Sequence, residues 1–206
     1  MRLTAPVSVA VLVSGSGSNL QALLDAQSAG ELPSARISLV ISDRAGVHAL
    51  DRARSVGVLP LVFDRRTLGL ERMERDMSEA LDERGIELLV LAGFLTILSP
   101  GFVKRFEGRM INIHPSLIPS FCGEGFYGLR VHEAALRRGV KLTGATVHLV
   151  NEDPDGGPIL AQKAVRVLKG DTPQTLQRRV MEQAEWRLLP RTVESYCRVL
   201  CRQGGR

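Results

Sequence analysis

The chain has 206 residues, a length that suits one domain with a substantial buried core. Its apolar share of 44% and charged share of 24% are ordinary for a globular protein, and no apolar stretch approaches the roughly 20 residues of a membrane-spanning helix. The formal charge is +5, but the Lys and Arg residues are scattered among acidic ones and aromatic residues make up only 4%. We therefore expect neither a membrane nor a nucleic acid as partner.

The cysteines and the N-terminus indicate a cytoplasmic protein. The chain has 3 cysteines, an odd number at irregular spacing, which argues against a disulfide framework. Cys197 and Cys201 lie one helical turn apart, but no His or acidic residue stands at zinc-site spacing from them, so we expect no metal. The N-terminal segment lacks the long apolar run and the cleavage site of a signal peptide.

Up to residue 100, apolar β-branched segments alternate with amphipathic ones. Nearly continuous apolar strands separated by helices are typical of a parallel sheet buried on both faces. The sequence therefore predicts an α/β fold, a doubly wound, mostly parallel sheet with helices on both faces and right-handed crossovers. The expected strands cover 7–13, 37–41, 59–63 and 86–91, and the expected helices cover 19–29, 47–56 and 70–84.

Beyond residue 100 the pattern is less regular. Strands are expected at 110–113, 146–150 and 159–167, a glycine-rich loop at 121–129, a turn at 151–158, helices at 174–189 and 191–200, and a frayed tail at 203–206. No repeat or linker divides the chain. We predict a single domain over 1–206, with its core at about 7–190 and a C-terminal helix and tail at 191–206.

The first candidate site is the segment 14–19 (SGSGSN), between the first strand and the first helix. Its glycines allow a sharp turn, and backbone N–H groups at the helix start would suit a phosphate. The segment lacks the Lys of a Walker A loop, and Leu20 stands where the dinucleotide fingerprint has its third glycine. A strand-to-helix turn with a polar helix cap explains the pattern equally well.

The second candidate is the pair Asn112 and His114 in the segment 110–117 (MINIHPSL). Alternation along a strand places both side chains on one side, and Pro115 ends the strand. Open α/β sheets bind their ligands at such strand ends. Because a His can move protons near neutral pH and an Asn amide can donate to an oxyanion, we favour a catalytic pair over a purely structural histidine.

The third candidate is Asp155 in the turn 153–158 (DPDGGP). A carboxylate near His114 would favour the charged ring and raise its pKa. An Asp that only caps a turn is the common alternative, and spacing alone does not bring Asp155 to His114.

Other reactive residues have weaker patterns. Cys122 has no assigned base for a nucleophilic role. The remaining candidates are expected to be structural: His48 and His132 on helix surfaces, His148 in a core or supporting position, and Trp186 in the core.

Four segments, in this order, resemble the phosphoribosylglycinamide formyltransferase family of purine biosynthesis: SGSGSNLQALLDA, LAGFLTILSP, INIHPSLIPSF and DPDGGPILAQ. The third and fourth are similar to segments of the wider group of enzymes that use 10-formyltetrahydrofolate, so they indicate the chemistry, while the glycine loop indicates the acceptor. The resemblance implies transfer of a formyl group from 10-formyltetrahydrofolate, as co-substrate, to the amine of phosphoribosylglycinamide, without a metal.

The same resemblance implies roles for individual residues. Asp155 would keep His114 protonated, so that this ring and the Asn112 amide stabilise the tetrahedral oxyanion. The substrate phosphate would lie on Gly17, Ser18 and Asn19, and the pterin would lie on Leu95, Thr96, Ile97, Leu98 and Asn112.

Three features depart from the family pattern. The loop 122–129 (CGEGFYGL) is longer than the Pro-Gly-Leu-type loop of many relatives. An Arg that many relatives use near the folate is replaced by Leu70, and Arg65 or Arg66 would take its place. Glu185 stands where relatives have a substrate-contacting Glu before a His, with one inserted residue nearby.

Two other functions remain as alternatives. Another formyl-folate enzyme, a tRNA formyltransferase or a formyltetrahydrofolate hydrolase, would be expected to carry a further domain, for which this chain leaves no room. A nucleotide-binding module without catalysis would have Asn112, His114 and Asp155 dispersed in space. The patterns are compatible with a monomer or a homodimer.

Overall fold

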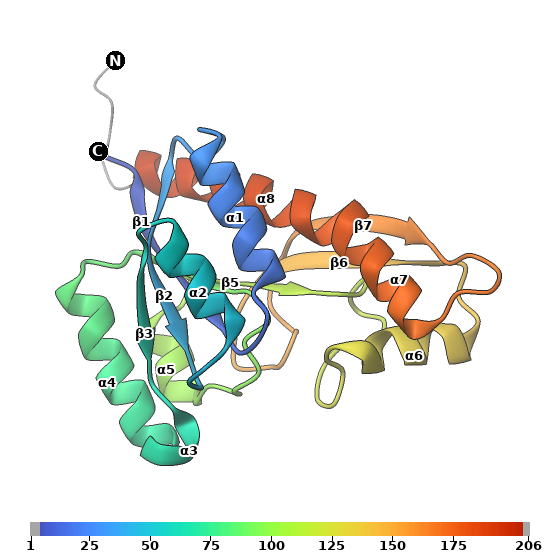
Figure 1. Ribbon diagram of the computed structural model, residues 1–206, viewed down its shortest axis with the longest axis horizontal. Helices are drawn as coiled ribbons and strands as arrows, with labels where there is room; N and C mark the ends of the chain where they lie inside the picture. The colour runs from blue at the N-terminus through green and yellow to red at the C-terminus, as the bar shows by residue number, and fades with distance from the viewer. Residues whose placement is uncertain (1–4, 204–206) are drawn as a thin grey trace.

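The computed structural model describes residues 5–203 and places seven strands in one sheet, in the order β3-β2-β1-β4-β5-β6-β7 (Figure 1). The strands are β1 (Val7–Val13), β2 (Ala35–Ser42), β3 (Leu59–Val62), β4 (Leu88–Leu91), β5 (Met110–His114), β6 (Leu142–Leu149) and β7 (Ile159–Arg166). The helices are α1 (Ser18–Ser28), α2 (His48–Ser55), α3 (Arg65–Leu68), α4 (Leu70–Glu83), α5 (Pro100–Arg105), α6 (Leu129–Arg138), α7 (Pro173–Val180), the π-helix η1 (Met181–Glu185) and α8 (Trp186–Gln203). None of these helices has the length and apolar character needed to cross a membrane. Residues 204–206 of the expected tail lie outside the described part of the chain.

The sheet changes direction at β5. Strands β1 to β5 are parallel to one another, whereas β6 is antiparallel to both β5 and β7. Helices connect the parallel strands, as the chain order requires. The predicted doubly wound, mostly parallel α/β sheet is confirmed.

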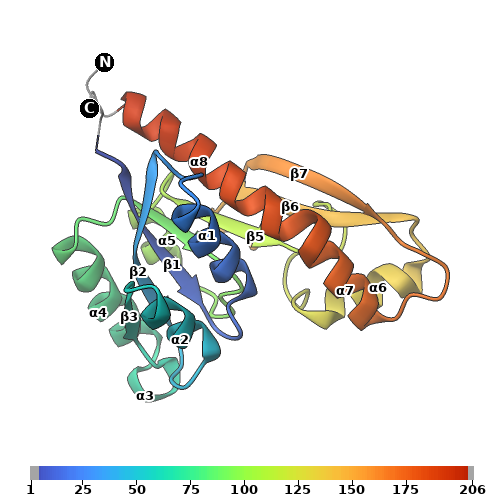
Figure 2. The same ribbon diagram turned by 45° about the horizontal axis from the view of Figure 1, so that its top comes forward.

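Helices cover both faces of the sheet because side chains alternate along each strand. In β1, Val9 and Val11 pack into the core beneath α1, α2 and α8, while Ala10 and Leu12 pack into the core beneath α4 and α5. Figure 2 shows α8 running across the sheet beside α1. The fully buried side chains of Val9, Val11 and Leu12 each contribute about 1.5–3 kcal/mol to folding, so the sheet is a rigid support for the loops at its ends.

The C-terminal helices differ from the prediction of two separate helices over 174–189 and 191–200. The structure continues from α7 through η1 into α8, which contains Pro190. A proline inside an α-helix normally clashes with the carbonyl four residues earlier, here that of Trp186. The helix nevertheless continues past Pro190 to Gln203, directly after the π-turn that ends at Glu185.

Candidate active site

A cavity of about 690 Å³ opens at the carboxyl ends of β1, β4 and β5. This is where the strand order reverses around β1, the point at which doubly wound sheets bind ligands. The walls are 14–19 after β1, 92–95 and Ile97 after β4, 112–115 at the end of β5, 123–128 and His132 at α6, Pro154 and Asp155, and Gln177, Met181 and Glu185 on the C-terminal helices. Several sequence-predicted segments therefore share one cavity.

The loop before α1 exposes a helix start to the cavity. Gly17 is the N-cap residue with φ of 75°, and a Cβ there would lie 2.6 Å from the Ala49 Cβ on α2. Only glycine suits both the left-handed backbone and the close approach of α2. No side chain caps the helix and its first turn holds no acidic residue, so its free N–H groups favour an anion.

Asn19 and Glu185 meet at the same wall. The Asn19 amide Nδ2 donates to Glu185 Oε2 at 2.6 Å, although 166 residues separate them in the chain. Glu185 is only 6% exposed, and this burial raises its pKa to about 7, against the lowering effect of the Asn19 hydrogen bond. The Asn19 Oδ1 atom has no partner among the described residues.

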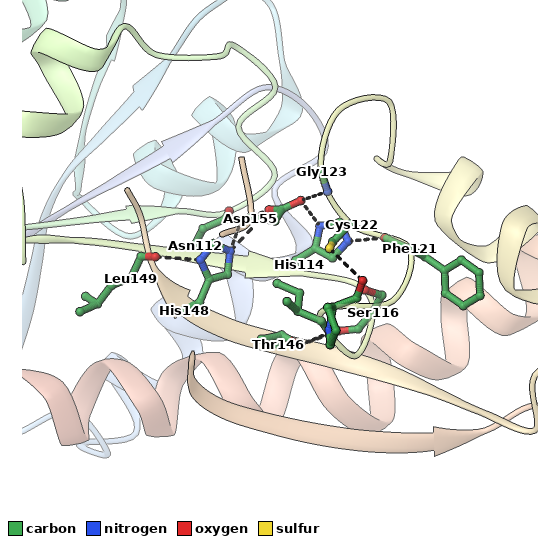
Figure 3. A network of polar contacts seen from close by, with 12 residues as sticks. Asn112, His114, Ser116, Phe121, Cys122, Gly123, Thr146, His148, Leu149 and Asp155 are labelled. Atoms are coloured by element: carbon green, nitrogen blue, oxygen red, sulfur yellow. Dashed lines mark hydrogen bonds and ion pairs between the residues drawn. The ribbon is translucent and has the colours of Figure 1, made fainter. Parts of the chain in front are cut away.

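Asn112, His114 and Asp155 form one cluster beside this wall (Figure 3). The Asp155 carboxylate lies between the other two side chains, with Oδ2 3.3 Å from His114 Nδ1 and Oδ1 accepting from Asn112 Nδ2 at 3.3 Å. The backbone N–H of Gly123 also donates to Asp155 Oδ2, at 2.9 Å. These distances contradict the alternative in which the three residues are dispersed.

The protonation of His114 is balanced between burial and its partners. Burial lowers the pKa of His114, and this effect outweighs the Asp155 carboxylate and the Phe121 carbonyl, which raise it. Asp155 thus raises the pKa of His114 as expected, but the net shift is downward, which contradicts the expectation that Asp155 keeps His114 protonated. Nε2 lies 2.8 Å from the Phe121 carbonyl and Nδ1 faces Asp155, so both ring nitrogens face acceptors that would stabilise a proton arriving during a reaction.

Asp155 itself stays ionised. Burial raises the pKa of Asp155. The rings of His148 and His114 and the Gly123 amide together lower it by a larger amount, so this pKa falls below its usual range. A neutral His114 beside an ionised Asp155 can accept a proton near neutral pH.

The backbone at the cluster is strained. Within residues 5–203, Phe121 (φ 52°) and Asp155 (φ 57°) are the only non-glycine residues with positive φ, and both contact His114. The turn that carries Asp155 also approaches β6 closely, because a Cβ at Gly157 would lie 1.8 Å from the Leu149 carbonyl oxygen. Strain of this kind persists where the surrounding structure imposes it, and it gathers at functional sites.

The predicted folate-binding residues are only partly brought together. Leu95 and Ile97 line the cavity, whereas Thr96 and Leu98 turn away from it into the protein. Of the other three, Asn112 lines the cavity, whereas Arg65 and Arg66 are exposed on α3 and do not line it.

Two histidines have places that sequence patterns describe poorly. His148 lies opposite Asn112 in the β5–β6 pair, and its Nε2 is 3.1 Å from Asn112 Nδ2 and 3.5 Å from Asp155 Oδ1. This confirms a core or supporting position. His132, expected on a helix surface, is instead fully buried at the cavity wall, because the face of α6 that carries it packs inward.

The described residues contain no group of three or more His, Cys, Asp or Glu side chains that could hold a metal ion. The cluster can instead offer an ionised carboxylate, an imidazole and an amide to a reacting carbonyl. These groups suit proton transfer and the stabilisation of an oxyanion.

Comparison with known proteins shows the family to which the chain belongs. The chain matches the Formyl transferase family model over residues 7–193. It is 37% identical over 187 residues to the phosphoribosylglycinamide formyltransferase of Haemophilus influenzae, covering 90% of this chain and 85% of that protein. The crystal structure of glycinamide ribonucleotide transformylase 1 from Symbiobacterium toebii superposes with a TM-score of 0.87 at 39% identity, covering 94% of this chain and 89% of that one. The chain belongs to the phosphoribosylglycinamide formyltransferase family.

Similar sequences also occur within a much longer protein. The trifunctional purine biosynthetic protein adenosine-3 of Gallus gallus is 45% identical over 195 residues, which are 93% of this chain. The chain spans only 18% of the length of that relative. The phosphoribosylglycinamide formyltransferase family is thus represented both by proteins of similar length and by one segment of a larger one.

Proposed function

We propose that the protein transfers the formyl group of 10-formyltetrahydrofolate to the amine of N1-(5-phosphoribosyl)glycinamide, in purine biosynthesis. The observation that carries the proposal is one cavity that contains both the uncapped start of α1 and the cluster of Asn112, His114 and Asp155. An anionic acceptor and a carbonyl donor could meet there. Family membership supports the same class of reaction.

The acceptor would bind at the α1 wall. Gly17, Ser18 and Asn19 would hold its phosphate, because the first backbone N–H groups of α1 point toward an anion there. Glu185 would contact a polar group of the same substrate. Because its pKa is raised to about 7 by burial, part of its population is uncharged near neutral pH and repels a nearby phosphate less.

The reaction would proceed by direct attack. The amine lone pair forms a bond to the formyl carbon, and the carbonyl electrons move to the oxygen. Rotation of the Asn112 side chain away from His148 would aim an N–H at that oxyanion. With Nε2–H donating to the Phe121 carbonyl, Nδ1 of His114 would accept the proton lost by the amine and return it to the folate N10 as the C–N bond breaks and the carbonyl forms again, while Asp155 stabilises the imidazolium. The products are the formylated amine and tetrahydrofolate.

The folate would bind on the opposite wall. Leu95 and Ile97 are 49% and 63% exposed there and would cover the pterin ring, whose polar edge would meet backbone groups of the segment 95–98. Arg65 and Arg66 would meet the acidic tail of the folate, because both are exposed cations on the nearby α3. We further propose a metal-free reaction in the cytoplasm by a monomer or homodimer, with no nucleic-acid partner.

The deciding assay mixes the purified protein with both substrates and follows formation of the deformylated folate. Turnover that needs the amine supports the proposal. No turnover above the folate-only control would defeat it, and equal turnover without the amine would indicate a hydrolase instead.

A substitution then tests the role of His114. His114→Ala should lower kcat by about 100-fold or more, with much smaller changes in the KM values, because the ring acts on the transition state. His48→Ala is the matched control, since the His48 side chain is 65% exposed on α2 and lies outside the cavity. Near-normal kcat in His114→Ala would refute this role.

A further inference from the structure

The segment 95–98, between β4 and α5, presents its side chains alternately to the cavity and to the protein. Leu95 and Ile97 are 49% and 63% exposed and line the cavity, whereas Thr96 is 6% exposed. Phe94 and Leu98 pack against the core beneath α4 and α5. The direction of the two cavity-facing residues therefore depends on what holds the residue between them.

Thr96 is held by a carboxylate from another strand end. Its Oγ1 donates to Asp43 Oδ2 at 2.7 Å, although the two residues are 53 positions apart. Asp43 directly follows β2, and its side chain is 2% exposed. Arg44 Nε lies 3.1 Å from the other carboxylate oxygen, so the buried charge is paired as well as hydrogen-bonded.

Other contacts hold the segment only toward its ends. Ser14 Oγ accepts from the Leu95 backbone N–H at 2.8 Å, and Glu74 accepts from the N–H and the hydroxyl of Ser99 at 2.6 and 2.5 Å. Among residues 5–203, the side-chain hydrogen bond between these anchors is the one from Thr96 to Asp43. This contact lies at the turn of the chain that projects Leu95 and Ile97.

We propose that Asp43 and Thr96 are a positioning pair that holds Leu95 and Ile97 toward the cavity and thereby sets the affinity for the pterin ring of the folate. The pair does not touch the reacting atoms. It acts by keeping two apolar side chains in place before the ligand arrives, which lowers the cost of ordering them on binding. This inference rests on the proposed function for the identity of the ligand, but not for the behaviour of the segment.

The test removes only the hydroxyl. In Thr96→Val, backbone amides of 94–98 should exchange hydrogen about tenfold faster or more, and the KM for 10-formyltetrahydrofolate should rise about tenfold. The KM for the phosphoribosylglycinamide and kcat should stay within about twofold. Thr96→Ser, which keeps the hydroxyl, should restore both exchange and folate KM toward the wild-type values.

Thr143→Val is the matched control. Thr143 is a buried residue of β6, 2% exposed, and its hydroxyl has no partner among the described residues, so the same chemical change removes no hydrogen bond. It should leave exchange in 94–98 and the folate KM unchanged. A second variant, Asp43→Asn, weakens the contact rather than removing it, and it can be used if Thr96→Val proves insoluble. It should raise the exchange rates in 94–98 and the folate KM by smaller factors.

Three results would overturn the positioning pair: unchanged exchange in Thr96→Val, a Ser variant that behaves like the Val variant, or an equal rise in the KM of both substrates. Absence of formyl transfer by the wild-type protein would instead defeat the proposed function. The exchange comparison would still decide whether Asp43 and Thr96 hold the segment.

Discussion

Glu185→Gln should stabilise the protein at alkaline pH at the expense of acceptor binding. Burial raises the pKa of Glu185 from 4.5 to about 7. In the unfolded chain this carboxyl loses its proton near pH 4.5, whereas the folded protein keeps the proton until about pH 7. The stability that depends on the protonated form is therefore complete below pH 4.5 and is lost as the pH rises through 7.

The size of this loss follows from the two pKa values. At 1.36 kcal/mol per pKa unit, ionising Glu185 in the folded protein costs about 3 kcal/mol at pH 8 and above. A Gln in its place cannot ionise. Its oxygen can still accept from Asn19 Nδ2, and its amide can donate to Asn19 Oδ1, which has no partner in the described part of the chain. The advantage of Gln over Glu should therefore grow by about 3 kcal/mol between pH 4.5 and pH 8.

Urea unfolding of both proteins at pH 4.5, 6 and 8 measures this difference. Glu182→Gln, an exposed substitution in the same helical turn, corrects for the general effect of removing a carboxylate. If the difference between Glu185→Gln and wild type does not change with pH, burial does not govern the proton on Glu185 and the reasoning is refuted. The KM for the acceptor should rise in Glu185→Gln, because the contact proposed for this carboxyl is altered.

Two further substitutions test the cluster and the turn that carries it. Asp155→Asn should lower kcat by about 100-fold or more in steady-state assays, because an amide cannot stabilise an imidazolium on His114; a kcat close to wild type would contradict this role. Gly157→Ala should lower the free energy of unfolding in urea by about 3 kcal/mol, because the new Cβ would meet the Leu149 carbonyl oxygen at 1.8 Å. Gly101→Ala is its control, since the nearest atom there lies at 3.9 Å, and equal stability of the two variants would contradict the clash.

The parts of the site that sequence predicts well are those that depend on local periodicity. Asn112 and His114 point into the same cavity because every second side chain of a strand lies on the same side. The buried parallel strands could be predicted as well, because a strand that is covered by helices on both faces needs a nearly continuous apolar sequence. The bounds of β1 agree with the predicted 7–13.

Contacts between distant segments could not be predicted in this way. Because β6 is antiparallel to β5, the segment after β6 starts beside Met110, at the amino end of β5, and Asp155 reaches His114 only because this segment folds back along the strand. The same register places His148 opposite Asn112. An apolar strand pattern does not state which neighbour it will pair with or in which direction, so neither contact follows from spacing.

Thr96 and His132 illustrate a second limit, which is the orientation of polar residues on irregular or amphipathic segments. Thr96 turns away from the cavity because Asp43, from a different strand end, accepts its hydroxyl. His132 is buried because it lies on the face of α6 that packs inward together with Val131 and Ala135. Both outcomes depend on partners that lie far away in the chain.

The change of strand direction at β5 divides the cavity between two kinds of connection. On the parallel side, the loops after β1 and β4 lead into helices, and they would bind the phosphate and the pterin. On the antiparallel side, the loop 150–158 between β6 and β7 brings Asp155 to His114. Because these connections are built independently, the binding loops can change in length and sequence over evolution while the proton-transfer geometry stays the same. Substrate selectivity and the chemistry of formyl transfer can therefore evolve separately, although both depend on loops of the same sheet.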